Sequence, residues 1–132
     1  MYEPILFSAY KTNGTNPFTT GMNITDFTGF LTNVGGANSF ILSSGIFLAP
    51  RNGIYEFSAS VSHDANDSDL AVVKNGEQVL QILFYWPSTD GFNWIMELQK
   101  GDQVQLQVIK GNFRCDGYVN CLFSGKIIKA II

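Results

Sequence analysis

The stretch GIFLAPRNGIYEFSASV, residues 45–61, decides the fold class of this 132-residue chain. From Tyr55 to Val61 an apolar residue alternates with Glu or Ser, which is the period-two pattern of a strand with one buried face. The segment Pro50-Arg51-Asn52-Gly53 interrupts this apolar pattern with residues that favour turns. The stretch therefore predicts two strands that meet at a tight corner, and it contains nothing that suggests catalysis.

The rest of the chain repeats this rhythm of short apolar segments separated by Gly, Asn, Ser and Thr, and no segment keeps a helical period. Such a pattern predicts an all-β sandwich or barrel. Asn75-Gly76 predicts a hairpin between residues 70–74 and 77–86. The turn at 100–102 predicts another hairpin, which joins residues 94–99 to 103–110.

The sequence also predicts which faces of two further strands are buried. Val104, Leu106 and Val108 should point into the core, because they alternate with glutamines. The final segment, residues 121–132, is apolar on both faces near its end. We expect it to be a last strand that is buried from both sides.

The composition is unusually apolar for a small domain. Hydrophobic residues make up 45% of the chain and charged residues 14%, whereas an average globular domain has about 25% charged residues. Residues 1–132 have the length of a single domain, and we expect other subunits to cover part of its apolar surface. The net charge of −3 argues against a nucleic-acid partner. No apolar run approaches the roughly 20 residues of a membrane-spanning helix, so membrane insertion is not expected.

The two cysteines, Cys115 and Cys121, lie six residues apart in the segment FRCDGYVNC. In an oxidising compartment they can close a short disulfide loop, and in a reducing one they remain ordinary thiols. A zinc site is a poor interpretation, because zinc takes four ligands and the single histidine, His63, is distant in sequence.

A series of short motifs resembles the globular head of complement C1q and its relatives in the C1q/TNF superfamily. GIFLAPRNGIYEF, residues 45–57, agrees with G-x-F-x-A-P-x-x-G-x-Y-x-F at every fixed position. Phe7-Ser8-Ala9 is similar to the F-x-A of the first strand, and LQKGDQVQL, residues 98–106, is similar to L-x-x-GD-x-V-x-L. VVKNGE and the closing FSGKI, with Ile127 in place of Leu, extend the resemblance over about residues 5–128.

The resemblance implies a ten-strand jelly-roll sandwich that assembles as a compact homotrimer, which would account for the apolar composition. It also implies that the motif residues build the scaffold. Gly45 and Gly53 would allow close approach or a positive φ, and Gly125 would let an aromatic ring pack where a side chain would clash. Members of this family often follow a signal peptide or a collagen-like stalk, and neither pattern is present in this sequence.

Residues 63–69 contain the candidates for catalysis and for metal binding. His63 and Asp64 lie in a polar turn near several serines, but nothing in the spacing predicts a catalytic triad, so we expect no enzyme activity. Asp64, Asp67 and Asp69 offer oxygen ligands that suit calcium. Turn formation explains the same residues without a metal, so calcium is a possible cofactor and none is required.

Two segments are candidate ligand-binding loops, because loops on a rigid β scaffold commonly carry binding residues. The first, FYWPSTDGFNW, residues 84–94, offers aromatic side chains that can stack on sugars or anchor a protein. The alternative is that Trp86 and Trp94 end strands and pack into the sandwich or a subunit interface. The second segment, RCDGYVNC, forms a loop tip. The candidate ligand-binding residues are Trp86, Asp90, Phe92, Asn93, Arg114, Asp116 and Tyr118.

Two classes of function remain open from the sequence. The first is an extracellular, lectin-like recognition module whose loops bind glycans, microbial surface patterns or a protein ligand, which follows from the match to the family motifs. The second is a structural trimer of a virus or phage particle, such as a capsid decoration, cement or fibre-tip protein on the virion surface. The missing leader and stalk favour this second class.

Overall fold

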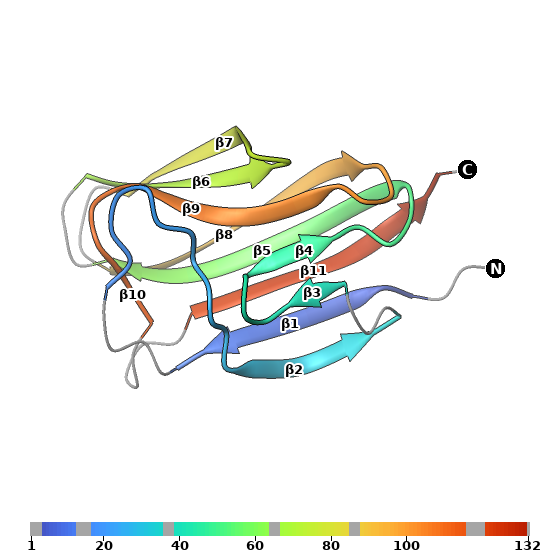
Figure 1. The fold of residues 1–132 in the computed structure, drawn as a ribbon, viewed down its shortest axis with the longest axis horizontal. Coiled ribbons are helices and arrows are strands. Elements are labelled where there is room, and N and C mark those ends of the chain that lie inside the picture. Colours follow the sequence, from blue (N-terminus) through green and yellow to red (C-terminus); the bar gives the residue numbers. More distant parts are fainter. Residues whose placement is uncertain are drawn as a thin grey trace.

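The computed structural model describes residues 4–12, 17–35, 39–63, 67–84, 88–115 and 121–131, with the backbone alone at 88–90. These residues form an all-β fold (Figure 1). The strands are β1 (Leu6–Lys11), β2 (Gly29–Val34), β3 (Phe40–Ile41), β4 (Ile46–Leu48), β5 (Gly53–His63), β6 (Ser68–Lys74), β7 (Glu77–Phe84), β8 (Ser88–Leu98), β9 (Gln103–Lys110), β10 (Phe113–Arg114) and β11 (Cys121–Ala130). No helix in the described ranges is long and apolar enough to cross a membrane.

Two antiparallel sheets form the sandwich. The six-stranded sheet runs β2-β1-β11-β5-β8, and β10 also pairs with β5 beyond the start of β11. The five-stranded sheet has the order β3-β4-β9-β6-β7. The predicted sandwich of the jelly-roll class is confirmed. The described residues contain eleven strands rather than ten, and two of these, β3 and β10, are only two residues long.

The corner in the opening stretch connects the two sheets. β4 pairs with β9 in the five-stranded sheet, whereas β5 pairs with β8 and β11 in the other. Tyr55 donates a hydrogen bond from its hydroxyl to the backbone oxygen of Arg51 at 2.6 Å, which ties the turn to the strand that follows. Burial raises the pKa of this hydroxyl, so the side chain stays a neutral donor. The predicted alternation is confirmed, because Tyr55, Phe57, Ala59 and Val61 are all buried.

Aromatic rings from both sheets fill the core. The Phe57 ring lies 5.3 Å from that of Phe47 and 5.4 Å from that of Trp94, measured between centroids. Gly125 makes this packing possible, since a Cβ there would lie 2.7 Å from the Phe7 ring and 2.8 Å from the Phe57 ring. The glycine role predicted from the motif FSGKI is thus confirmed, and the rings concerned are those of Phe7 and Phe57.

The hairpin predicted at residues 100–102 is wrong. β8 pairs with β5 in the six-stranded sheet, and β9 pairs with β4 and β6 in the five-stranded sheet. The chain therefore crosses from one sheet to the other at this turn. Gly101 donates its N–H to the oxygen of Ala49, and Ala49 donates to the oxygen of Asp102. Those bonds attach the turn to the chain after β4, which a local reading of turn residues could not reveal.

The expectation that the last strand is buried from both sides is also wrong near its end. A register shift lies between Ile127 and Lys129 in the pairing of β11 with β5, and Ile128 is 51% exposed. Only one face of β11 meets the core, because the six-stranded sheet has the second sheet on one side alone. Its outer face is left uncovered in the single chain.

Asp102 organises the turn between the sheets and gives the fold a measurable pH dependence. Its carboxylate accepts hydrogen bonds from Asn75 Nδ2 at 3.0 Å and from the Gln99 N–H at 2.8 Å. These bonds, with Lys74 nearby, hold the pKa of Asp102 below its ordinary value. The resulting stabilisation is complete above the unfolded-state pKa and is lost as the pH falls through the lower folded-state pKa.

We therefore expect Asp102→Asn to destabilise the protein near neutral pH and to lose this effect below about pH 4. Urea midpoints of both proteins, measured at neutral and at strongly acidic pH, test this. A difference between the two midpoints that stays constant across this range would contradict the assignment.

Candidate functional site

The strand ends that lead into the predicted loops lie together at one end of the sandwich. His63, the last residue of β5, pairs with Ser88 at the start of β8 and with Phe113 of β10. Its ring lies 4.6 Å from that of Phe84, where β7 ends in the other sheet. Lys11, the last residue of β1, pairs with Cys121. Figure 1 shows these strand ends on the left-hand side. We call this the loop end.

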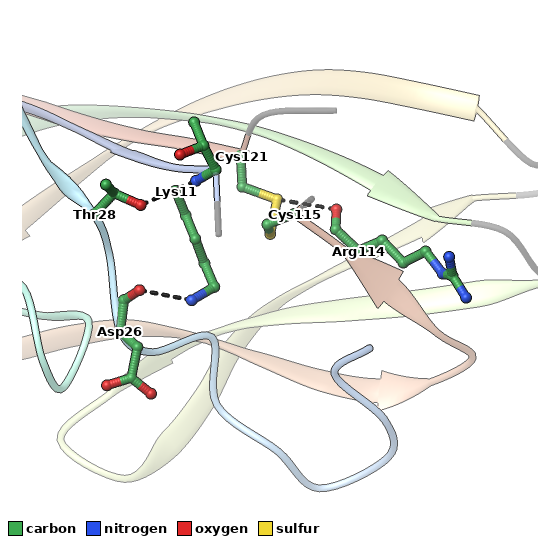
Figure 2. Close-up of a disulfide and its surroundings, with 7 residues drawn as sticks. Lys11, Asp26, Thr28, Arg114, Cys115 and Cys121 are labelled. Carbon is green, nitrogen blue, oxygen red and sulfur yellow. Dashed lines mark hydrogen bonds between the residues drawn. A yellow bond between two sulfur atoms is a disulfide. The ribbon is translucent and has the colours of Figure 1, made fainter. Parts of the chain in front are cut away.

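A disulfide closes the loop end. Cys115 and Cys121 are bonded, with 5.1 Å between their Cα atoms, and both are buried. Figure 2 shows the disulfide beside Lys11, with Cys121 Sγ 3.3 Å from the backbone oxygen of Arg114. Of the two states considered for these cysteines, the structure contains the oxidised one. The bond joins β10 to the start of β11 and holds the second predicted loop at its base.

Removing the disulfide with Cys115→Ser and Cys121→Ser should lower the free energy of unfolding by about 2–3 kcal/mol, because the loop it closes is short. Chemical denaturation of the double variant and of the oxidised wild type measures this difference. Equal midpoints would show that the bond adds nothing to the stability of the fold.

Lys11 is the buried cation of the loop end, with only 6% of its surface exposed. Its Nζ donates to the backbone oxygen of Asp26 at 2.6 Å and lies 5.5 Å from the centre of the Phe18 ring (Figure 2). Burial lowers the pKa of Lys11, and the Asp26 carboxylate partly opposes this shift. Both contacts link the end of β1 to the segment between β1 and β2, which is a structural role. The sequence did not single out Lys11, because a lysine in a strand is usually exposed.

The first predicted loop is largely a strand. β8 begins at Ser88 and pairs with β5 along its whole length, so Asp90, Phe92 and Asn93 belong to a sheet. The Phe92 ring stacks on Trp94 with 5.5 Å between centroids and packs against the core. The interpretation of Phe92 as an exposed loop aromatic is therefore wrong, and Trp94 packs into the sandwich, as the alternative held. Trp86 and the side chain of Asp90 lie outside the described residues.

Of the remaining candidate ligand-binding residues, some are exposed and the others lie outside the described residues. Arg114, in β10, is exposed beside the disulfide, whereas Asp116 and Tyr118 lie outside the described residues. Asn93 is exposed on the outer face of β8. Among the residues considered for catalysis, His63 is buried, and its ring packs against those of Phe84 and Phe113.

Two of the three acidic residues that were considered for calcium lie in the described part of the chain. Asp67 is exposed in a turn, and Asp69 in β6 accepts a hydrogen bond from Gln81 Nε2 at 3.1 Å. Asp64 lies outside the described residues. In the described part of the chain, no group of three His, Cys, Asp or Glu side chains has the geometry of a metal site.

The outer face of the six-stranded sheet carries two adjoining hollows that the sequence did not predict. They have volumes of about 420 and 430 Å³ and share Ser58, Asn93 and Ser124. Exposed aliphatic residues border this face, and Ile95 is 61% exposed. In the sequence, these hollows correspond to short polar residues that alternate with core residues in several strands. Their alignment depends on strand registers, which no local pattern reports.

β7 forms a second uncovered surface, at the free edge of the five-stranded sheet. Val79, Leu80 and Leu83 are exposed along it. A register shift between Val72 and Val73 in the pairing with β6 accompanies this exposure. Exposed apolar residues on an edge strand are typical of a surface that meets another chain.

Comparisons with known proteins agree with this architecture. Among solved structures, the globular domain of zebrafish complement 1qA protein has a TM-score of 0.77 at 17% identity, with 96% of this chain and 99% of that chain covered. Murine APRIL at pH 8.5 has a TM-score of 0.68 at 13% identity, covering 94% and 99% of the two chains. Eiger TNF from S. frugiperda has a TM-score of 0.65 at 9% identity, covering 97% and 96%. A search of curated proteins returned no match.

The decisive comparison is with protein families. The family description "C1q domain" matches residues 6–128, which is nearly the whole chain. Domains of the C1q/TNF class are typically trimeric, extracellular ligand-binding modules without enzymatic activity. The order of strands, the corner between β4 and β5 and the match over residues 6–128 together establish that this chain belongs to the C1q domain family.

Proposed function

We propose that this protein is a non-enzymatic, extracellular homotrimer whose loop end recognises a glycan, a microbial surface pattern or a protein ligand. The observation that carries the proposal is the convergence of strand ends at one rigid, disulfide-closed end of a C1q domain. Binding residues are commonly held on loops that a stable scaffold positions. The undescribed candidates Trp86, Asp116 and Tyr118 all lie in connections that start from these strand ends.

The uncovered apolar surface supports the trimer. Exposed large hydrophobic residues include Val34, Ile95 and Ile128 on or beside the six-stranded sheet. β7 adds three more on a different side of the sandwich. Contacts between two different surfaces of the same chain are head to tail, and they close into a ring when the rotation permits. A ring of three copies would cover both surfaces on every subunit.

Screening the assembled protein against an array of glycans tests the recognition function. We expect specific binding by the wild type and loss of that binding in Trp86→Ser and in Arg114→Ala, with the molecular mass unchanged. Lys110→Ala, which changes an exposed cation in β9, is the matched control for Arg114→Ala. Glycan binding that survives both loop substitutions would place recognition elsewhere on the protein. An assembly that binds neither glycans nor any extracellular protein would contradict the function.

Removing divalent ions with a chelator tests whether the protein requires calcium. We expect EDTA to leave the melting temperature and ligand affinity unchanged, because the described aspartates are not arranged as a metal site. A fall in either quantity that is reversed by added calcium would establish a calcium requirement. Asp67→Asn and Asp69→Asn would then locate the ion.

A further inference from the structure

Asn75-Gly76 forms the turn between β6 and β7, and the same dipeptide occurs twice more in the chain, at Asn52-Gly53 and at Asn13-Gly14. An asparagine followed by glycine can lose its side-chain amide without an enzyme, because glycine has no side chain to hinder its backbone nitrogen. Asn13-Gly14 lies outside the described residues. The other two pairs share the same chemistry, so the fold decides which of them reacts.

The reaction is a ring closure followed by hydrolysis. The Gly76 backbone nitrogen attacks Cγ of Asn75, the Cγ–Nδ2 bond breaks, and Nδ2 leaves as ammonia with the proton of the Gly76 N–H. Water then opens the five-membered imide at either of its carbonyl carbons. The product is aspartate or isoaspartate at position 75, so the side chain gains a negative charge and loses its hydrogen-bond donor.

Gly76 has room for this ring closure. It is exposed, and no atom lies within 4 Å of the position that its Cβ would take. Lys74 and Glu77 pair across the turn, so the ladder bonds there belong to these flanking residues. The N–H of Gly76 therefore lies outside the ladder, and the attacking nitrogen is not held by a neighbouring strand.

Gly53 is confined by comparison. It is buried, and it pairs with Leu98 of β8 on one side and with Ala130 of β11 on the other. A Cβ there would lie 2.7 Å from the Lys129 backbone oxygen. Ring closure at Asn52 would need Gly53 to turn out of both strand pairings, which makes this site the slower of the two.

Both ends of the Asn75 amide are bonded in the folded protein. Nδ2 donates to Asp102 Oδ1 at 3.0 Å, and Oδ1 accepts the N–H of Gln103 at 2.8 Å. These bonds join exposed groups at the end of a hairpin, so local fluctuations open them. The Gln103 N–H also stabilises the negative charge that Oδ1 acquires when Cγ is attacked. The bonds therefore slow the reaction without preventing it.

We propose that Asn75 is a site of spontaneous deamidation in the folded protein, and that its new carboxylate opens the junction at Asp102. The reaction replaces the donor to Asp102 Oδ1 with a second negative charge. Lys74 Nζ lies 3.8 Å from Asp102 Oδ2, and a single cation does not balance two carboxylates. The crossing turn at Asp102 is then loosened. The change needs only water, so it accumulates with the age of the molecule.

Incubation of the wild type at neutral pH, in water labelled with a heavy oxygen isotope, tests the site. Peptide mass spectrometry measures the label that hydrolysis of the imide leaves at each asparagine. The folded protein is compared with the chain unfolded in urea, site by site. We expect folding to slow the reaction at Asn52 about tenfold more than at Asn75. Equal slowing at the two sites, or greater slowing at Asn75, would overturn the proposed site.

Asn75→Asp reproduces the charge of the product, and Asn52→Asp is its matched control. Both variants keep the side-chain oxygen that accepts a backbone N–H, from Gln103 and from Lys100 respectively. We expect Asn75→Asp to have the lower urea midpoint at neutral pH. The difference should shrink below about pH 4, where protonation removes the repulsion with Asp102. Equal midpoints at neutral pH would overturn the proposed opening of the junction.

Discussion

Phe57→Ala lowers the free energy of unfolding by about 3–5 kcal/mol, because it removes a fully buried aromatic ring. The Phe57 ring contacts the rings of Phe47, Trp94 and Phe123, so it joins the two sheets. The cavity left behind could not close easily, since the surrounding rings come from several strands. Chemical denaturation gives the free energy, and the melting temperature should fall by about 10 °C or more.

Ser60→Ala is the control, because it lies three residues further along β5 on the opposite, outer face. It should change the stability by no more than about 0.5 kcal/mol. If Phe57→Ala were as mild as Ser60→Ala, the face assignment of β5 would be wrong, and so would the sandwich built on it.

Gly45→Ala is expected to cost about 2–5 kcal/mol, combining a strained backbone with a steric clash. Gly45 has a φ of 71°, which disfavours side chains, and a Cβ there would lie within 2.1 Å of the Ile24 backbone oxygen. The backbone at Ile24 cannot move aside as a flexible side chain can. The substitution should therefore push apart the start of β4 and the segment that leads to β2.

Gly76→Ala distinguishes the cost of backbone strain from the cost of the steric clash. Gly76 has a φ of 84°, but no atom lies within 4 Å of the position of its Cβ. It should therefore show the backbone strain alone, of about 1–3 kcal/mol. Denaturant midpoints of both variants measure the difference. Equal losses at the two glycines would mean that the close approach of Ile24 to Gly45 does not exist in solution.

The sequence predicted the fold where a residue's role follows from its immediate neighbours. Alternation identified the buried face of β5, and Asn75-Gly76 identified the hairpin between β6 and β7. The turn at Gly101 failed for the same reason, since a local pattern cannot tell a hairpin from a crossover between sheets. Its outcome depends on bonds to Ala49, some fifty residues earlier in the chain.

The candidate site was less predictable than the fold. Aromatic residues near Pro87 suggested an exposed loop, yet Phe92 and Trp94 pack against the core because β5 pairs with β8 down to Ser88. Cys115 and Cys121 were correctly placed as a possible pair. The hollows on the outer face of the six-stranded sheet could not be predicted, because their polar lining residues come from five separate strands: Ser8, Thr32, Ser58, Asn93 and Ser124. Only the registers bring them into one line.

The molecular mass in dilute solution tests the central claim that copies of this chain cover one another's exposed surfaces. Sedimentation equilibrium at micromolar concentration should give about 44 kDa, three times the 14.6 kDa of one chain. A protein that sediments at 14.6 kDa across the whole concentration range, while remaining folded and soluble, would contradict the account.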